Sequence, residues 1–171
     1  MIFRTLVLKV SGWKPFIKLV TETKLFRGLV SRFVPGETLD DAMVAAEELA
    51  AKGFGVSLDL LGENVSSEEE ANKATDAYIE IIERIKTSEH KEKINISIKL
   101  TALGLDQSKE LALANYSRIL EAGQGEDIFV RADMEGSPYT AVTIELLESV
   151  FAKYKNTGTV LQSYLHRTPS D

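Results

Sequence analysis

The amino-acid sequence predicts an α/β protein built around a parallel β-sheet. Short apolar segments alternate with longer segments of helical spacing along most of the 171 residues. Several of the helical segments begin at a capping signal and end at a glycine or a turn. Parallel strands need crossover connections of a dozen or more residues, usually helices, so this order of elements favours a parallel sheet with helices packed against it. The length fits one domain.

The first helix and the first strand are marked by their ends. Thr38 is a suitable N-cap residue and Asp41 stands in the capping-box position, which predicts a helix over about 38–52. Gly53 is suited to the left-handed conformation that commonly ends a helix. The next segment, 54–61, alternates apolar and polar side chains and therefore predicts a strand.

The later elements follow the same rhythm. Ser67 and Glu70 form a second capping box, which predicts a helix up to about Lys86. The remaining predictions are helices over about 108–122 and 139–153, and strands over about 94–100, 127–133 and 158–164. With the first strand this makes four strands separated by helices, which is the pattern of a parallel sheet.

The first part of the chain has a different character. Residues 1–33 place apolar side chains at helical spacing with basic side chains between them. Residues 1–35 contain seven basic side chains against one acidic side chain, Glu22. We therefore expect an α-helical arm over 1–35, followed by the α/β domain over 36–171. The arm either covers the domain with its apolar face, or lies on a membrane surface with its basic face toward the lipid headgroups.

The composition excludes several classes of function. The net charge is −6, and after residue 35 the chain holds 13 basic and 25 acidic side chains, which argues against nucleic-acid binding by the main domain. Because there is no cysteine, thiol nucleophiles, thiolate metal sites and disulfides are excluded. His90 and His166 alone argue against a multi-histidine metal site. No apolar run approaches the roughly 20 residues of a membrane-spanning helix.

Each predicted strand has one apolar face and one mixed face, because successive side chains of a strand point to opposite sides. The mixed face of the sheet carries Asp59, Lys99, Arg131, Asp133 and Gln162. Unpaired charges are costly to bury, so these groups must pair with one another, bind a ligand or meet water. Their formal charges sum to zero, which fits a structural layer of ion pairs, above all for Asp59 and Arg131.

The position of the polar groups also indicates a binding site. Lys99, Asp133 and Gln162 lie near the C-terminal ends of their predicted strands, as does the turn that contains Glu63. In βα barrels and open α/β sheets this end holds the ligand. The sequence contains no glycine-rich phosphate loop and no nucleophile elbow. Glu63, Asp133 and Glu135 could supply a pair of carboxylates, as in glycosidases, but their separation is not predictable from the sequence.

Blocks at the predicted strand ends resemble one known family. The segments LDLLGENV, SIKLTALGLD, VRADMEGSPYT and VLQSYLHRT resemble, in order and spacing, the strand-end blocks of the proline dehydrogenases, and RFVPGETLDDA resembles the entry to their barrel. The basic arm is similar to that of the bacterial single-function enzymes. The resemblance implies the N-terminal half of a (βα)8 TIM-like barrel, truncated after the fourth strand, since a whole barrel typically needs about 250 residues.

The resemblance also implies an activity. Proline dehydrogenases bind FAD and oxidise L-proline to 1-pyrroline-5-carboxylate, passing hydride to the flavin and electrons on to a membrane quinone. For this chain we therefore expect a cytoplasmic protein with peripheral contact to the inner face of the cell membrane through residues 1–33, and no nucleic-acid partner. The absence of cysteine fits a reducing compartment.

Four residues match family positions that contact substrate or flavin. Lys99 matches the lysine that binds the proline carboxylate, and Asp133 matches the active-site aspartate. Met134 matches the residue whose backbone touches the flavin, and Gln162 matches the glutamine that hydrogen-bonds to the isoalloxazine ring. A compact ammonium suits a carboxylate, and polar groups near a flavin ring tune its electronic properties.

Two further acids match positions around the substrate. Glu63 resembles a gate glutamate that pairs with a substrate-binding arginine, and Asp59 resembles an acid that supports the groups in contact with the ligand. Two other functions fit the same residues. A half-barrel with exposed strand edges would suit an interaction or regulatory module without catalysis. A barrel aldolase would use Lys99 to form a Schiff base, although Asp59 and Asp133 on the same predicted face favour a charged lysine.

Overall fold

The computed structural model describes residues 38–171, and the predicted arm over 1–35 lies outside this range. The helices are α4 (Leu39–Ala51), α5 (Glu68–Lys86), α6 (Lys109–Gln124) and α7 (Thr140–Phe151), with a short 3-10 helix η1 (Lys91–Lys93). The strands are β1 (Val56–Asp59), β2 (Ile94–Ile98), β3 (Val130–Ala132) and β4 (Thr157–Thr159). Helices and strands alternate as the sequence predicts.

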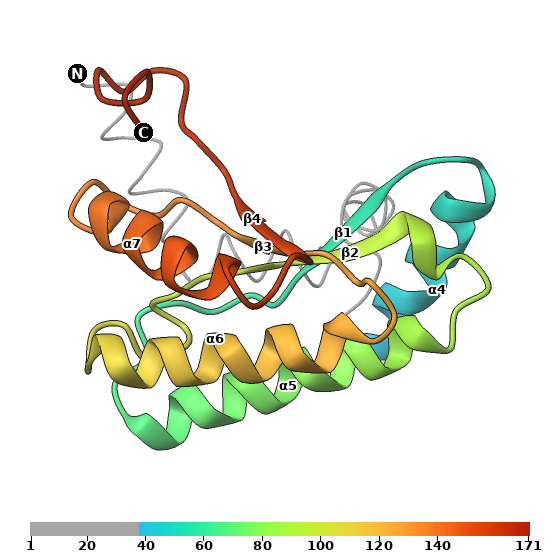
Figure 1. The fold of residues 1–171 in the computed structure, drawn as a ribbon. Helices are drawn as coiled ribbons and strands as arrows, with labels where there is room; N and C mark the ends of the chain where they lie inside the picture. Colours follow the sequence, from blue (N-terminus) through green and yellow to red (C-terminus); the bar gives the residue numbers. More distant parts are fainter. Residues whose placement is uncertain (1–37) are drawn as a thin grey trace, which may run out of the picture. The chain divides into compact units, whose positions relative to one another are not determined.

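The four strands form one sheet in the order of the sequence, β1-β2-β3-β4. Each neighbouring pair is parallel. The helices α5, α6 and α7 make the three crossover connections between successive strands (Figure 1). This arrangement confirms the predicted α/β class, and its sequential order is that of part of a βα barrel wall.

The crossover helices cover one face of the sheet. In Figure 1, α5 and α6 run side by side along the sheet, and both helices contact strands of it. The apolar side chains of β2, Ile94, Ile96 and Ile98, are buried. The buried side chains of the two helices include Tyr78, Ile82, Ile85, Tyr116, Ile119 and Leu120. The apolar strand faces therefore pack against helices, as the alternation predicts, and the mixed strand faces point to the other side.

Both predicted capping boxes begin helices, with one difference. Thr38 Oγ1 accepts a hydrogen bond from the Asp41 N–H at 3.2 Å, and Asp41 accepts one from the Thr38 N–H at 3.3 Å. Ser67 Oγ accepts from the Glu70 N–H at 3.2 Å. The Glu70 carboxylate, however, accepts from the N–H and hydroxyl of Ser66, one residue before the N-cap. These bonds lower the pKa of Glu70 and keep a negative charge at the N-terminus of α5, where the helix dipole favours it.

The last strand differs most from its prediction. The sequence predicts a strand over 158–164, but β4 ends at Thr159. Its partner β3 has three residues, and a bond from the Val160 N–H to the Ala132 carbonyl at 3.3 Å extends the pairing by one step. The chain then folds in turns around the carbonyl of Gln162. β propensity depends on a neighbouring strand to pair with, so the segment beyond the end of β3 does not continue as a strand of the sheet.

Buried polar contacts fix the start of β4. Thr157 Oγ1 donates a hydrogen bond to the carbonyl of Val130 at 2.8 Å and lies 2.5 Å from the hydroxyl of Tyr116. The side-chain amide of Asn156 donates to two backbone carbonyls, one in α6 and one just before β3. These bonds set the position of β4 against β3, and so determine where residues 160–162 leave the sheet.

Candidate active site

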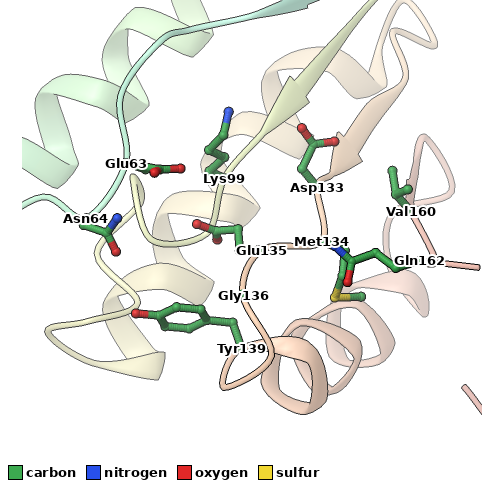
Figure 2. A pocket seen from close by; sticks show the side chains of 10 residues that line it. All are labelled: Glu63, Asn64, Lys99, Asp133, Met134, Glu135, Gly136, Tyr139, Val160 and Gln162. Atoms are coloured by element: carbon green, nitrogen blue, oxygen red, sulfur yellow. The ribbon is translucent and has the colours of Figure 1, made fainter. Parts of the chain in front are cut away.

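The loops that follow the strands surround an open pocket of about 580 Å³ at the C-terminal edge of the sheet (Figure 2). Most of the predicted site residues come together in this pocket. Its lining includes Glu63, Lys99, Asp133, Met134 and Gln162. The remaining one, Asp59, lies at the end of β1 and is joined to the pocket through Lys99. The polar strand ends thus converge at the edge of the sheet where the sequence predicts a ligand.

An ion pair with Asp59 holds Lys99 at the pocket. Lys99 Nζ lies 2.6 Å from Asp59 Oδ2, and the hydroxyl of Tyr78, on α5, donates to Asp59 Oδ1 at 3.4 Å. Burial lowers the pKa of Lys99, but the hydrogen bond to Asp59 and its charge act in the opposite direction. The charges of Asp133 and Glu63 add to this effect, so the pKa of Lys99 is raised overall. A lysine that stays protonated argues against Schiff-base chemistry, which needs the neutral amine.

Asp133 extends the sheet pairing to the rim of the pocket. Its N–H donates to the carbonyl of Ile98 at 2.9 Å, which continues the contact between β2 and β3. In Figure 2, the Asp133 carboxylate and the Lys99 ammonium point to the same side of the pocket. Within residues 38–171 the carboxylate makes no hydrogen bond. Its oxygens are therefore available to a ligand.

The other end of the pocket combines apolar surface with an amide. Met134 follows Asp133, whereas Val160 and Gln162 come from the segment after β4 (Figure 2). In the part of the chain that the structure describes, the Gln162 side chain makes no hydrogen bond. An apolar wall with an available amide suits a flat heteroaromatic ring that carries both donors and acceptors. These residues therefore fit a flavin ring. No three acidic or histidine side chains among residues 38–171 are grouped so as to hold a metal ion.

Thr101 joins the loops that follow β1, β2 and β3. The N–H of Asn64, in the first loop, donates to Thr101 Oγ1 at 3.2 Å. The Thr101 N–H donates to one carboxylate oxygen of Glu135 at 3.1 Å, and the Thr101 hydroxyl donates to the other. Asn64 and Glu135 both line the pocket. One side of the pocket is therefore built on a hydrogen-bonded network that spans three loops.

Within residues 38–171 Arg131 forms no ion pair, which corrects its interpretation as a member of an ion-pair layer. Asp59 is paired with Lys99, and no carboxylate among the described residues bonds to Arg131. Its guanidinium donates instead to Ser57, Asn95 and Ser97. On the mixed face of the sheet, Lys99 and Asp59 thus form an ion pair at the pocket. Farther from the pocket, the guanidinium of Arg131 is hydrogen-bonded to neutral side chains of β1 and β2.

Sequence reasoning missed several residues of this site, among them Thr101, Tyr139 and Tyr78. Thr101 stands two positions after Lys99, at a strand end, so its position was a usable signal. Tyr139 lines the pocket, and its hydroxyl donates to Asp106 at 2.7 Å. Tyr78 lies on α5, and no local pattern connects it with Asp59, from which it is 19 residues distant. That contact depends on how the helix packs on the sheet.

Comparison with known proteins points to one family. The sequence profile of the family described as "Proline dehydrogenase" matches residues 42–171. "Proline dehydrogenase 1" of Bacillus subtilis is 35% identical over 140 residues, which cover 82% of this chain and 46% of that protein. "Proline dehydrogenase" of Deinococcus radiodurans is 31% identical over 173 residues, which cover 99% of this chain and 55% of that protein. The chain thus spans about half the length of these relatives.

The fold also has a counterpart among solved structures. The chain is similar to the crystal structure of proline utilization A from Bdellovibrio bacteriovorus inactivated by N-propargylglycine, with a TM-score of 0.74 and 26% identity. The match covers 96% of this chain and 20% of that chain. The four-stranded sheet with its helices therefore corresponds to part of a known barrel architecture.

Proposed function

Because this chain belongs to the proline dehydrogenase family, we propose that it provides substrate- and flavin-contacting residues of an enzyme that oxidises L-proline to 1-pyrroline-5-carboxylate. The observation that carries the proposal is that one pocket holds both a protonated lysine, Lys99, and an available amide, Gln162. The first suits the carboxylate of an amino acid, and the second suits the polar edge of a flavin.

Lys99 is the proposed partner of the substrate carboxylate. An ammonium has three N–H donors, and within residues 38–171 only Asp59 takes one of them, which leaves two that a ligand could use. We assign Asp133 as the active-site aspartate, because its carboxylate faces the same pocket without a hydrogen-bond partner in the described range. There it can accept a hydrogen bond from the nitrogen of bound proline. Glu63, on the first loop, is assigned to the gate of the pocket.

Met134 and Gln162 are the residues of this chain that would hold FAD. The Gln162 amide can hydrogen-bond to the ring, and the backbone of Met134 would contact it. When bound, the flavin supplies a hydride acceptor for the carbon next to the proline nitrogen. The task of the protein is to orient the substrate: Lys99 fixes the carboxylate, and Asp133 fixes the nitrogen. Such positioning lowers the entropic part of the barrier.

We propose that activity also requires the second half of the barrel. The pocket is bounded here by loops from four strands, and the chain spans about half the length of its relatives. Residues 36–171 would then be the first half of a (βα)8 barrel, preceded by the arm over 1–35. Small-molecule sites usually bury most of their ligand, so a second half that closes the pocket would strengthen binding.

We propose that a membrane quinone is the final acceptor of the electrons. We also propose that the enzyme is cytoplasmic and contacts the inner face of the cell membrane through residues 1–33. The support is the excess of basic side chains between apolar positions in this segment. No helix among residues 38–171 is long and apolar enough to cross a bilayer. The intact protein is here the enzyme with both halves of the proposed barrel. Deleting the arm from it should reduce sedimentation with anionic liposomes more than it reduces flavin content. Unchanged sedimentation would favour the covering-helix interpretation.

Two substitutions in the intact protein test the proposed function. Lys99→Ala should weaken binding of an unreactive proline analogue by about 1.5–3 kcal/mol while FAD is retained, because one charge-assisted contact is lost. Gln162→Ala should change the flavin spectrum or potential before it changes analogue affinity. Lys109→Ala is the control, since Lys109 pairs with Glu145 away from the pocket.

Three outcomes would contradict the assignments. Loss of FAD with unchanged analogue affinity in Lys99→Ala would assign Lys99 to the cofactor instead. Unchanged flavin properties in Gln162→Ala would remove Gln162 from the flavin site. A folded intact protein that binds neither FAD nor the proline analogue would favour the interaction module over an enzyme.

A further inference from the structure

We propose that Thr101 and Glu135 are positioning residues that fix the turn carrying Glu63 at the mouth of the pocket, and thereby set the affinity for the substrate. This inference rests on the proposed function, because the position of Glu63 matters only if the pocket takes proline. It assigns a role to Thr101 and Glu135, two residues for which the proposed function gives no contact with the substrate.

The anchor is one buried residue with three hydrogen bonds, two through its hydroxyl and one through its backbone N–H. Thr101 is fully buried just beyond β2. Its hydroxyl accepts from the Asn64 N–H at 3.2 Å and donates to Glu135, while its N–H donates to the second oxygen of Glu135 at 3.1 Å. The bonds from Thr101 to the carboxylate are charge-assisted, and such bonds are about twice as strong as neutral ones. Glu135 therefore holds the Thr101 hydroxyl in the rotamer that can accept from Asn64.

The turn that carries Glu63 needs such an anchor. Asn64 has a φ of 53°, in the left-handed region that is unfavourable for residues other than glycine, although asparagine tolerates it better than most. Glu63 and Asn64 are both exposed, so packing does little to hold them. A second side-chain bond, from Gln107 to the carbonyl of Val65 at 2.7 Å, holds the loop beyond Asn64. Among the contacts of residues 38–171, the bond to Thr101 is thus the one placed to hold the turn itself.

The hydrogen bonds of Thr101 also distinguish the roles of two nearby acids, Glu135 and Glu63. Both oxygens of Glu135 accept hydrogen bonds from Thr101, so this carboxylate is engaged in the scaffold. Figure 2 shows the Glu63 side chain reaching from its loop toward the pocket, on the side of Lys99. Within residues 38–171 the Glu63 carboxylate makes no hydrogen bond. Glu63 is therefore available to a ligand or a gate partner, provided that its turn stays in place.

The first test is hydrogen exchange in the intact, proline-free protein. Thr101→Val removes the hydroxyl at nearly constant volume, and Glu135→Gln removes the charge and one acceptor with less risk to folding. Both should speed exchange in segment 60–66 at the amide of Asn64, which donates to Thr101, by about tenfold for Thr101→Val. Thr101→Ser keeps the hydroxyl and should restore slow exchange. Thr143→Val is the matched control, because Thr143 is a buried threonine of α7 whose hydroxyl has no hydrogen-bond partner in the described structure.

The second test is steady-state kinetics of the flavin-loaded enzyme. Thr101→Val and Glu135→Gln should raise KM for proline by about tenfold and change kcat by less than about twofold, because a loose gate turn weakens retention of substrate without touching the reacting atoms. Thr101→Ser should show the KM of the unaltered enzyme. A general loss of structure would lower kcat and flavin content as well, which distinguishes it from a positioning role.

Two results overturn the inference: unchanged exchange of segment 60–66 in both variants, or faster exchange with an unchanged KM. If the intact enzyme oxidises no proline, the proposed function fails, and the effect on the substrate fails with it. The exchange data then still decide whether the anchor exists. The failure of the anchor and the failure of the proposed function are therefore distinguishable.

Discussion

The ammonium of Lys99 and the carboxylate of Asp59 lie 2.6 Å apart, although 40 residues separate them in the sequence. Their side chains are only 20% and 33% exposed, so water screens this pair less than a fully exposed ion pair. The hydroxyl of Tyr78 donates to the second oxygen of Asp59 and holds the carboxylate from the helix side. The protonation of Lys99 depends on this contact, and under the proposed function so would the affinity of the pocket for the substrate carboxylate.

Replacing Asp59 should therefore change the pH dependence of binding. The raised pKa of Lys99 keeps it cationic at high pH, and Asp59→Asn removes the main cause that raises this pKa and leaves the effect of burial. The alkaline loss of proline-analogue affinity should begin at lower pH in the variant. Affinity measured in the intact protein between about pH 7 and 11 checks this, since free lysine titrates near 10.4. Asp76→Asn, which breaks a surface ion pair with Arg118, should leave the pH dependence of the analogue affinity unchanged.

Tyr116 should make the fold less stable at high pH. Burial raises the pKa of Tyr116 to about 12, although its bond to Thr157 lowers it. The folded pKa exceeds the unfolded value of about 10, so the contribution to stability is complete below about pH 10 and is lost as pH rises through about 12. In that window the free energy of unfolding should fall by about 1.4 kcal/mol per pH unit for this group.

Tyr116→Phe should remove the contribution of Tyr116 to the fall in the free energy of unfolding with rising pH. The buried phenol of Tyr78 also has a raised pKa, so some slope should remain. Urea unfolding at several alkaline pH values measures the difference. Tyr164→Phe is the control, because Tyr164 is 78% exposed. Equal slopes for Tyr116→Phe and the unaltered chain would contradict the argument.

Gly104 should not tolerate a side chain. It has a φ of 97°, and a Cβ there would lie 2.6 Å from Leu111 Cδ2 and 3.1 Å from the Cβ of Ala71. Gly104→Ala should lower the free energy of unfolding by about 2 kcal/mol or more, from backbone strain and overpacking between α5 and α6. Gly125→Ala should leave it unchanged or raise it by up to about 1 kcal/mol, since Gly125 has a φ of −66° and an added Cβ would meet no atom within 4 Å. Equal effects of the two substitutions in urea unfolding would refute this.

The chain by itself should neither hold FAD stoichiometrically nor oxidise proline. In residues 38–171 the pocket is open, so a flavin would have protein on one side and water on the other. Catalysis by hydride transfer also needs a site from which water is excluded. The measurement is flavin absorbance per purified chain, together with proline-dependent dye reduction. A yellow, active monomer would show that a second half is dispensable, whereas activity restored by a separately expressed C-terminal half would support the proposal.

Much of the fold could be predicted from local sequence. Thr38 and Ser67 predict helix starts because their side chains satisfy N–H groups of the first turn, and both do so in the structure. The alternation in 94–100 predicts which strand face packs against helices, since a strand sorts its side chains by position alone. The convergence of Lys99 and Gln162 at one edge follows from the parallel order, because parallel strands end at the same side of a sheet.

Tertiary structure decided which groups meet. Asp59 pairs with Lys99 rather than Arg131, β4 stops at Thr159, and Thr101 joins three loops. Each of these outcomes depends on the reach of side chains from neighbouring elements and on the length of the partner strand, which local spacing does not encode. The order of the elements, the polar face of the sheet and the edge that holds the pocket follow from local sequence patterns alone. The hydrogen bonds within that pocket were decided by packing, because their energy depends on distances between residues that are far apart along the chain.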